Sequence, residues 1–256
     1  MSAWLVALLV PFQLFAHSHR RPVLAGGLRT AHSARLANPV GTALALQGAV
    51  DEGTLVIRED TGEVAREAFR LATVQVGEHV EHWKLATNVR YGRGRPVVVL
   101  SPALEVGPDS QPLSLEYDVI DPQGPERILG QQGRARFVVR TLGRRMERAR
   151  EFALAGPMVV LDDSVFALYR FVAPYARPAP RILAAIYPRS GRRETLTVRD
   201  LGLAATTLNR NPATLRHVMV TGGAAGDVHL WLASDGRLMK IEIPARRLSV
   251  ERLPAA

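Results

Sequence analysis

Residue-by-residue alternation of apolar and polar side chains is the feature that most constrains how this chain folds. From about Asp51 onward the pattern recurs, as in residues 113–119 and again in residues 239–243. Successive side chains of a β-strand point to opposite faces of the sheet, so this alternation predicts strands with one buried and one solvated face. The sequence therefore predicts a mostly β protein.

Short segments rich in turn-forming residues separate the predicted strands. Three of them are Glu59–Gly62, Asp121–Gly124 and Ser234–Gly236. Aspartate and serine bend the chain through local hydrogen bonds, and glycine takes a positive φ without steric cost. Parallel neighbours need a crossover of a dozen or more residues, so gaps this short predict antiparallel pairing.

One stretch near the middle of the chain departs from the alternation. Asp162, Asp163 and Ser164 form a polar trio that suits a helix N-terminus, and Pro174 follows the apolar run after them. Four apolar residues recur there at helical spacing: Val165, Phe166, Tyr169 and Val172. We expect a strongly curved antiparallel sheet, an unclosed barrel, wrapped around a short helix over residues 163–172. For residues 144–152 both a helix and a strand fit the pattern.

The first fifty residues differ from the rest of the chain. An apolar stretch, Leu5–Phe15, precedes the small-residue segment Ala16–Ser18, as in a secretory signal peptide, although no Lys or Arg comes before it. The stretch is short for a bilayer span. We expect residues 1–50 to be a signal-like leader and poorly ordered tail, and residues 51–256 to be a single β-rich domain of an exported, periplasmic or extracellular protein. The alternative is a disordered cytosolic leader.

The formal net charge is +9, and arginine supplies most of it. Arg134, Arg136 and Arg140 belong to a basic cluster that continues to Arg150 and, on a strand, would share one face. Guanidinium groups pair with phosphate oxygens, so this face suits an anionic head group or peripheral contact with an anionic membrane. The alternative is a solvated outer face that discourages edge-to-edge pairing. A nucleic acid partner is not expected, because few aromatic residues lie among the arginines.

Several chemistries are missing from the sequence. The absence of cysteine excludes disulfides, thiol nucleophiles and thiolate metal sites. His79 and His82 would lie on opposite faces of a strand, and His217 and His229 are isolated strand residues, so we predict no metal site. Asp162 and Asp163 are candidate acids, but a helix cap accounts for them equally well. No nucleophile elbow, phosphate loop or dinucleotide fingerprint is present, so we expect no enzyme activity and no cofactor.

Scattered turn and core positions carry a weak family likeness. They include Gly53–Ile57, Leu161–Asp162, Tyr187–Pro188 and Ile241–Pro244. This pattern resembles uncharacterised bacterial exported proteins whose sheet forms an unclosed barrel, similar in shape to the periplasmic lipoprotein carriers. The resemblance would cover most of the chain after Gly53. It implies a fold and supplies no functional residue.

These observations lead to one expected function and one alternative. The expectation is a non-enzymatic binding or carrier protein of the cell envelope for an apolar or lipid-like ligand, with Arg134, Arg136 and Arg140 at an anionic head group. Five aromatic residues are predicted to line its cavity: Trp83, Tyr117, Phe166, Tyr169 and Trp231. The alternative is a structural or assembly factor that binds another envelope protein through its sheet edges and basic face and has a filled interior.

Overall fold

The computed structural model describes residues 46–76, 79–92, 96–143 and 147–254. The predicted signal segment lies outside the described residues. The first strand begins at Leu46, ahead of the predicted start of the β-rich domain at Asp51.

Within the described ranges, fifteen strands form one sheet. The strands are β1 (Leu46–Glu59), β2 (Gly62–Val76), β3 (His79–Tyr91), β4 (Val98–Val106), β5 (Pro112–Asp121), β6 (Gly124–Gln132), β7 (Arg136–Leu142), β8 (Glu147–Ala153), β9 (Met158–Val160), β10 (Arg181–Tyr187), β11 (Arg192–Leu208), β12 (Asn211–Thr221), β13 (Val228–Leu232), β14 (Leu238–Ile243) and β15 (Leu248–Arg252). Both a helix and a strand fitted residues 144–152, and the described part of that stretch belongs to strand β8.

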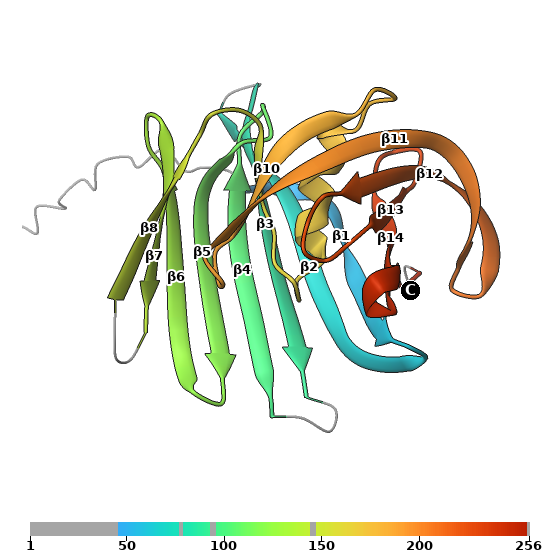
Figure 1. The fold of residues 1–256 in the computed structure, drawn as a ribbon, viewed down its shortest axis with the longest axis horizontal. Helices are drawn as coiled ribbons and strands as arrows, with labels where there is room; N and C mark the ends of the chain where they lie inside the picture. The colour runs from blue at the N-terminus through green and yellow to red at the C-terminus, as the bar shows by residue number, and fades with distance from the viewer. Residues whose placement is uncertain (1–45, 77–78, 93–95, 144–146, 255–256) are drawn as a thin grey trace, which may run out of the picture. The chain divides into compact units, whose positions relative to one another are not determined.

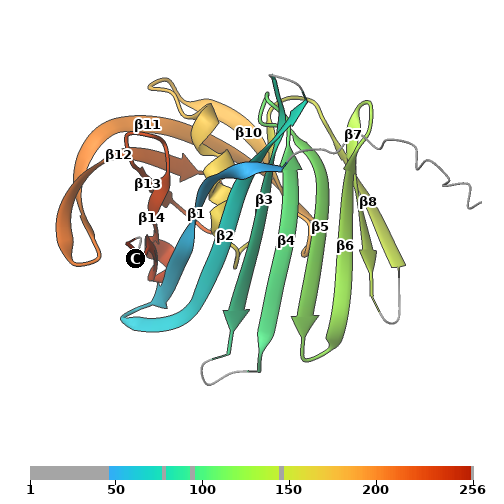
Figure 2. The same ribbon diagram turned by 180° about the vertical axis from the view of Figure 1, so that it is seen from behind.

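The sheet order shows why the barrel is not closed. It runs from β8 back to β1, then through β15 back to β9, so the first and last strands pair in the middle of the sheet. Figure 2 shows β1 to β8 side by side in chain order. The two edge strands, β8 and β9, are consecutive in the chain yet lie at opposite ends of the hydrogen-bonded order. All pairs are antiparallel except β9 with β10. The predicted unclosed, antiparallel sheet is confirmed.

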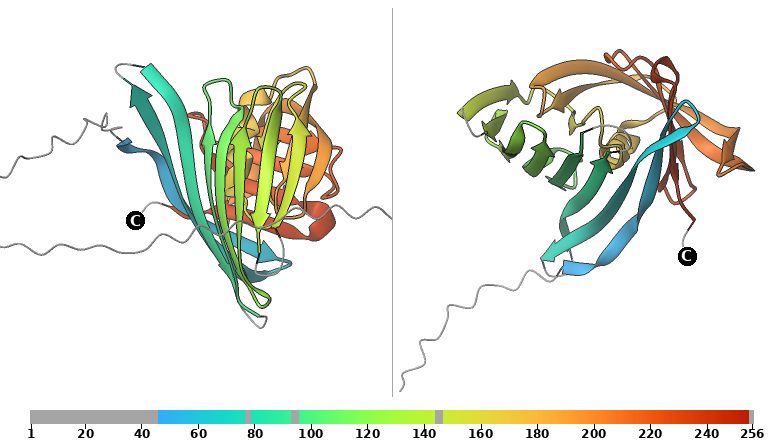
Figure 3. Two further views of the ribbon diagram at one scale, coloured as in Figure 1. Left: turned by 90° about the vertical axis from the view of Figure 1, so that its left-hand side faces the viewer. Right: turned by 90° about the horizontal axis from the view of Figure 1, so that it is seen from below.

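A short helix lies on the concave side of the sheet, as predicted (Figure 1; Figure 3, right). It is made of two 3-10 turns, η1 (Ala167–Phe171) and η2 (Ala173–Tyr175); a third, η3 (Pro244–Arg246), precedes β15. The helix starts later than the predicted Asp163 and carries no side-chain cap at Phe166. Asp162 and Asp163 do not cap this helix. Their carboxylates form ion pairs with Arg189 and Arg192.

The core lies between this helix and the concave face of the sheet. Phe166 and Val172 are fully buried there, and so are the inward residues Leu55, Leu100 and Ile128. One glycine is required by the packing: a Cβ at Gly130 on β6 would lie 2.6 Å from the Phe137 ring. The alternation read from the sequence thus marks which face of each strand reaches the core.

Candidate functional site: a groove at the open seam of the sheet

A groove of about 680 Å³ lies where strands β5 to β8 approach the turn between β10 and β11. We call it the seam groove. Its lining comes from the β5–β6 turn, the concave side of β7 and β8, and the β10–β11 turn. The lining residues are Asp121, Gln123, Gly124, Pro125, Glu126, Val139, Thr141, Gly143, Arg148, Arg150, Pro188, Arg189, Ser190 and Gly191.

Strand alternation decides which arginines face the groove. On β8, Arg148 and Arg150 alternate with outward residues and share the face of the buried Phe152. On β7, Arg136 and Arg140 alternate with the buried Phe137, so they lie on the outer face.

The third arginine of the predicted set is not in a strand. Arg134 is exposed in the turn before β7, where the Gly133 amide donates to the carbonyl of Arg136. Arg136 also forms an ion pair with Glu151 on the outer face. The structure therefore separates the predicted set, Arg134, Arg136 and Arg140, from the groove. Their predicted contact with a head group stays a prediction.

Arg150 joins the edge strand to the opposite wall of the groove. Its Nη1 donates to the carbonyl oxygen of Gly191 at a distance of 2.8 Å. Gly191 has a φ of +68°, and a Cβ there would lie 2.5 Å from the Arg150 guanidinium. A side chain thus bridges β8 and the β10–β11 turn at the seam.

Arg189 is held on the same wall by a buried acid. Its Nε and Nη2 donate to the two carboxylate oxygens of Asp162, each at a distance of 3.0 Å. The hydroxyl of Tyr117 and the amide of Ser164 donate to the same carboxylate at 3.1 and 2.8 Å. Burial raises the pKa of Asp162, and Arg189 opposes that rise. A bidentate pair of this kind fixes the orientation of the guanidinium.

The neighbouring acid is paired in the same way. Asp163 accepts two hydrogen bonds from Arg192, at 3.0 and 3.1 Å, and the Arg192 guanidinium lies over the Tyr187 ring. Both acids thus pair with arginines at or just after the β10–β11 turn. The helix-cap interpretation of this pair is replaced by two ion pairs.

Glu67 on β2 is a buried polar residue that the sequence reasoning missed. Its carboxylate accepts hydrogen bonds from the amides of Phe166 and Ala167, at 2.7 and 3.0 Å, and from the Thr87 hydroxyl at 2.7 Å. Glu67 is fully buried, and this burial raises its pKa to about 7 although the hydrogen bonds oppose the rise. The signal in the sequence is a glutamate on the apolar face of β2, two residues before Phe69.

The five predicted cavity aromatics do not share one space. Tyr117, Phe166 and Tyr169 are buried in the core, and Trp83 is half-buried against it. Trp231 lies on the opposite face of β13 from the core residue Leu230. A void beside the helix measures only about 10 Å³ and is lined by none of the five, whereas one water needs about 10–15 Å³. Their predicted contact with a ligand stays a prediction.

In the part of the chain that the structure describes, no helix combines the length and the apolar character that a membrane span requires. No known family model matches the chain, and no curated protein matches it. A solved structure, the crystal structure of a β-barrel-like protein of the domain of unknown function DUF1849 from Brucella abortus, shares 11% identity with this chain at a TM-score of 0.42. The match covers 80% of this chain and 96% of that one.

Proposed function

We propose that this protein is a non-enzymatic binding protein that holds an anionic ligand, such as a phosphate-bearing head group, in the seam groove. The observation that carries the proposal is the convergence of Arg148, Arg150 and Arg189, from an edge strand and a distant turn, on one groove. Guanidinium groups present several donors in a planar fork that matches phosphate oxygens.

The size and polarity of the groove support this ligand class. Its volume of about 680 Å³ lies within the range of roughly 300–1,000 Å³ that is usual for ligand sites. The lining also contains Asp121, whose Oδ1 accepts hydrogen bonds from the amides of Gln123 and Gly124, and Glu126, whose carboxylate would accept a hydrogen bond from a hydroxyl group of the ligand.

An apolar tail, if the ligand has one, has no place in the core beside the central helix. Tyr117, Phe166 and Tyr169 pack against other side chains and are at most 3% exposed. We therefore keep the anionic head group of the expected ligand, and we assign its contacts to the arginines of the groove in place of Arg134, which precedes β7, and Arg136 and Arg140, which lie on the outer face of β7.

Binding without catalysis is proposed because the two adjacent acids are engaged. Asp162 and Asp163 each accept two hydrogen bonds from an arginine, and a general base needs a free site for the proton it removes. Export to the cell envelope also stays a proposal. It rests on the apolar leader, and the amino-terminal mass of the mature protein tests it.

Isothermal titration with soluble dihexanoyl phosphatidic acid tests the groove directly. The double variant R148Q/R150Q removes two groove arginines, and R136Q/R140Q removes the same charge from the outer face of the adjacent strand. We expect the groove variant to bind at least about tenfold more weakly, because a hydrogen bond to a charged group contributes about 1.5–3 kcal/mol. The outer-face variant should bind like the unsubstituted protein.

Two further titrations identify the source of the anion. Inorganic phosphate binding as tightly as the phosphatidic acid would assign the groove to a free phosphate group. Dihexanoyl phosphatidylcholine, whose head group is zwitterionic, should bind weakly. Equal loss in both double variants, or no binding of any probe, contradicts the proposal.

An assembly factor is the second candidate, and one observation favours it. In the described residues the edge strand β8 pairs with β7 alone, and the core behind it is filled. An unpaired edge can add a strand from a partner protein. Capture of a partner that R148Q/R150Q leaves intact, together with no binding of the phosphate probes, would favour this function.

A further inference from the structure

The polar groups of the seam groove come from three neighbouring strands and differ in kind. On β6, Glu126 shares the concave face of the buried Ile128. On β7, Thr141 shares the face of the buried Val139, and Arg148 lies on the same side of β8. A carboxylate, a hydroxyl and a guanidinium therefore follow one another across the concave side of the sheet.

Strand register fixes the order and the spacing of these groups. Thr141 pairs with Ile128 of β6 on one side and with Arg148 of β8 on the other. Glu126 lies two residues before Ile128, and Gly143, directly after β7, adds no side chain to the lining. β6 and β8 are two strand spacings apart, roughly 10 Å. A sugar ring that carries one phosphate spans such a gap with a hydrogen bond at each end.

Glu126 is the acid of this groove that remains for a ligand. Asp121 already accepts hydrogen bonds from the amides of its own turn, Gln123 and Gly124. Glu126 is half-buried, and within the described ranges no group forms a hydrogen bond or ion pair with it. A carboxylate accepts hydrogen bonds, and it repels a phosphate. Its presence beside an anion site therefore favours an anion that also carries hydroxyl groups.

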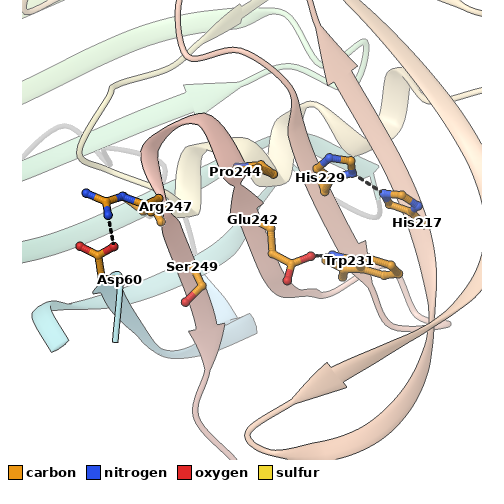
Figure 4. A pocket seen from close by; sticks show the side chains of 9 residues that line it. Asp60, His217, His229, Trp231, Glu242, Pro244, Arg247 and Ser249 are labelled. Carbon is orange, nitrogen blue, oxygen red and sulfur yellow. Dashed lines mark hydrogen bonds and ion pairs between the residues drawn. The ribbon is translucent and has the colours of Figure 1, made fainter. Parts of the chain in front are cut away.

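A second hollow, of about 460 Å³ on the outer face of β12 to β15, has its polar groups already paired (Figure 4). We call it the outer hollow. Its pairs are His217 Nε2 with His229 Nδ1 at 2.9 Å, the Trp231 indole with Glu242 at 2.9 Å, and Arg247 with Asp60 at 3.0 Å. The two histidines, expected to be isolated, meet because β12 pairs with β13. Each acid of the outer hollow thus has a partner, whereas Glu126 of the seam groove has none among the described residues.

We propose that the ligand of the seam groove is a phosphorylated polyol, such as a sugar phosphate, whose hydroxyl groups donate to Glu126. The inference rests on the proposed function and narrows its ligand class. Arg148, Arg150 and Arg189 bind the phosphate, while Glu126 and the Thr141 hydroxyl accept hydrogen bonds from the polyol. A phosphate without hydroxyl groups meets the same arginines but offers no donor to Glu126. Glu126 is therefore the residue that selects the polyol.

Isothermal titration of the full chain compares two phosphate monoesters that differ in their hydroxyl groups. Methyl phosphate carries none, and myo-inositol 1-phosphate carries several. We expect the inositol ester to bind at least about tenfold more tightly, since a hydrogen bond to a charged group contributes enough for that factor. Dihexanoyl phosphatidylinositol presents the same polyol as a lipid head group. Tighter binding of this lipid assigns the site to a head group, and tighter binding of the free ester assigns it to a soluble polyol phosphate.

Substitutions of Glu126 should change the binding of the two esters differently. Glu126→Ala removes the acceptor, so the inositol ester should lose its advantage. Methyl phosphate should bind as before or more tightly, because a nearby negative charge is gone. Glu126→Gln keeps a neutral acceptor and should retain part of the advantage. Asp60→Asn, which removes a negative charge from the outer hollow, is the matched control and should leave both titrations unchanged. Circular dichroism checks that each variant is folded.

The outcomes distinguish the polyol from the anion site on which it depends. Equal binding of the two esters by the unsubstituted protein overturns the polyol assignment, and so does a Glu126→Ala protein that keeps the full preference. If methyl phosphate binds in that case and R148Q/R150Q weakens it, the anion site stands without the polyol. If neither ester binds, both proposals are wrong.

Discussion

Glu67 shows at the scale of one residue how a carboxylate can replace a helix cap. The first amides of a helix have no partner within it, and they usually receive one from the residue just before the helix. Here Glu67 supplies two acceptor oxygens from β2, to the amides of Phe166 and Ala167. Its own burial is compensated by these bonds and by Thr87. The carboxylate therefore fastens the central helix to the sheet.

Replacing Glu67 with Gln should destabilise the protein. The side-chain amide has one acceptor oxygen, and its NH2 group would face hydrogen-bond donors. The expected loss in the free energy of unfolding is about 1–3 kcal/mol, the usual effect of leaving a buried polar group unpaired. Urea denaturation measures it. Thr87→Val, which removes one of the three bonds, is the matched control and should cost less. A Glu67→Gln protein as stable as the original would contradict this role.

Glu67 should also make stability depend on pH. Its pKa in the folded protein is raised from 4.5 to about 7, so between these values the unfolded chain has lost a proton that the folded protein keeps. Stability then falls as pH rises through this window and levels off above it. The difference in unfolding free energy between the original protein and Glu67→Gln should therefore shrink from pH 4.5 to pH 7. A difference that grows with pH would contradict the assignment.

At the scale of elements, the β10–β11 turn depends on a glycine. Gly191 has a φ of +68°, which side chains with a Cβ rarely adopt, and Arg150 lies directly against it. Gly191→Ala should lower the free energy of unfolding by at least about 1 kcal/mol, since an alanine at positive φ is strained.

A double-mutant cycle separates the two causes. In an Arg150→Ala background the clash is removed and only the backbone strain remains, so Gly191→Ala should cost less there but still cost something. The same cost in both backgrounds would show that Arg150 does not contact the turn.

How far the sequence predicted these elements depends on how local their causes are. Strands such as residues 113–119 were found because alternation is a property of neighbouring residues. The start of the helix was misplaced because its partner, Glu67, is 99 residues from Phe166.

The candidate site depended on facts that no local pattern contains. Residues 144–152 fitted a helix or a strand, so the face shared by Arg148 and Arg150 was not readable. Arg134 was assigned to a strand because the alternation of side chains includes it. The turn that holds it is closed by a backbone hydrogen bond from Gly133 to Arg136, and that bond leaves no pattern in the sequence. His217 and His229 meet through strand register alone.

At the scale of the whole domain, stability depends on the junction between the first and last strands. β1 and β15 pair in the middle of the sheet, and a buried ion pair, Arg252 with Asp51 at 2.6 Å, crosses this junction. Arg252→Gln leaves Asp51 buried without its partner. It should cost about 3–5 kcal/mol of unfolding free energy, as breaking a buried pair usually does.

An exposed pair in the same part of the sheet is the control. Arg247 pairs with Asp60 at 3.0 Å, and both side chains are more than half exposed. Arg247→Gln should cost at most about 1 kcal/mol. If the two variants lose equal stability in chemical denaturation, the junction is not held by its buried pair.

The open seam is the consequence of this topology that bears most on function. Since β8 and β9 do not pair with each other in the described residues, side chains such as Arg150, rather than a ladder of backbone bonds, connect the two walls of the seam, and a groove with arginines remains. A crystal structure of the protein with dihexanoyl phosphatidic acid would show whether the groove holds the phosphate. We expect the phosphate to lie within hydrogen-bonding distance of Arg148, Arg150 or Arg189 in the seam groove. A phosphate bound on the outer face beside Arg136 and Arg140, or acyl chains inserted between Tyr117 and Phe166, would contradict it.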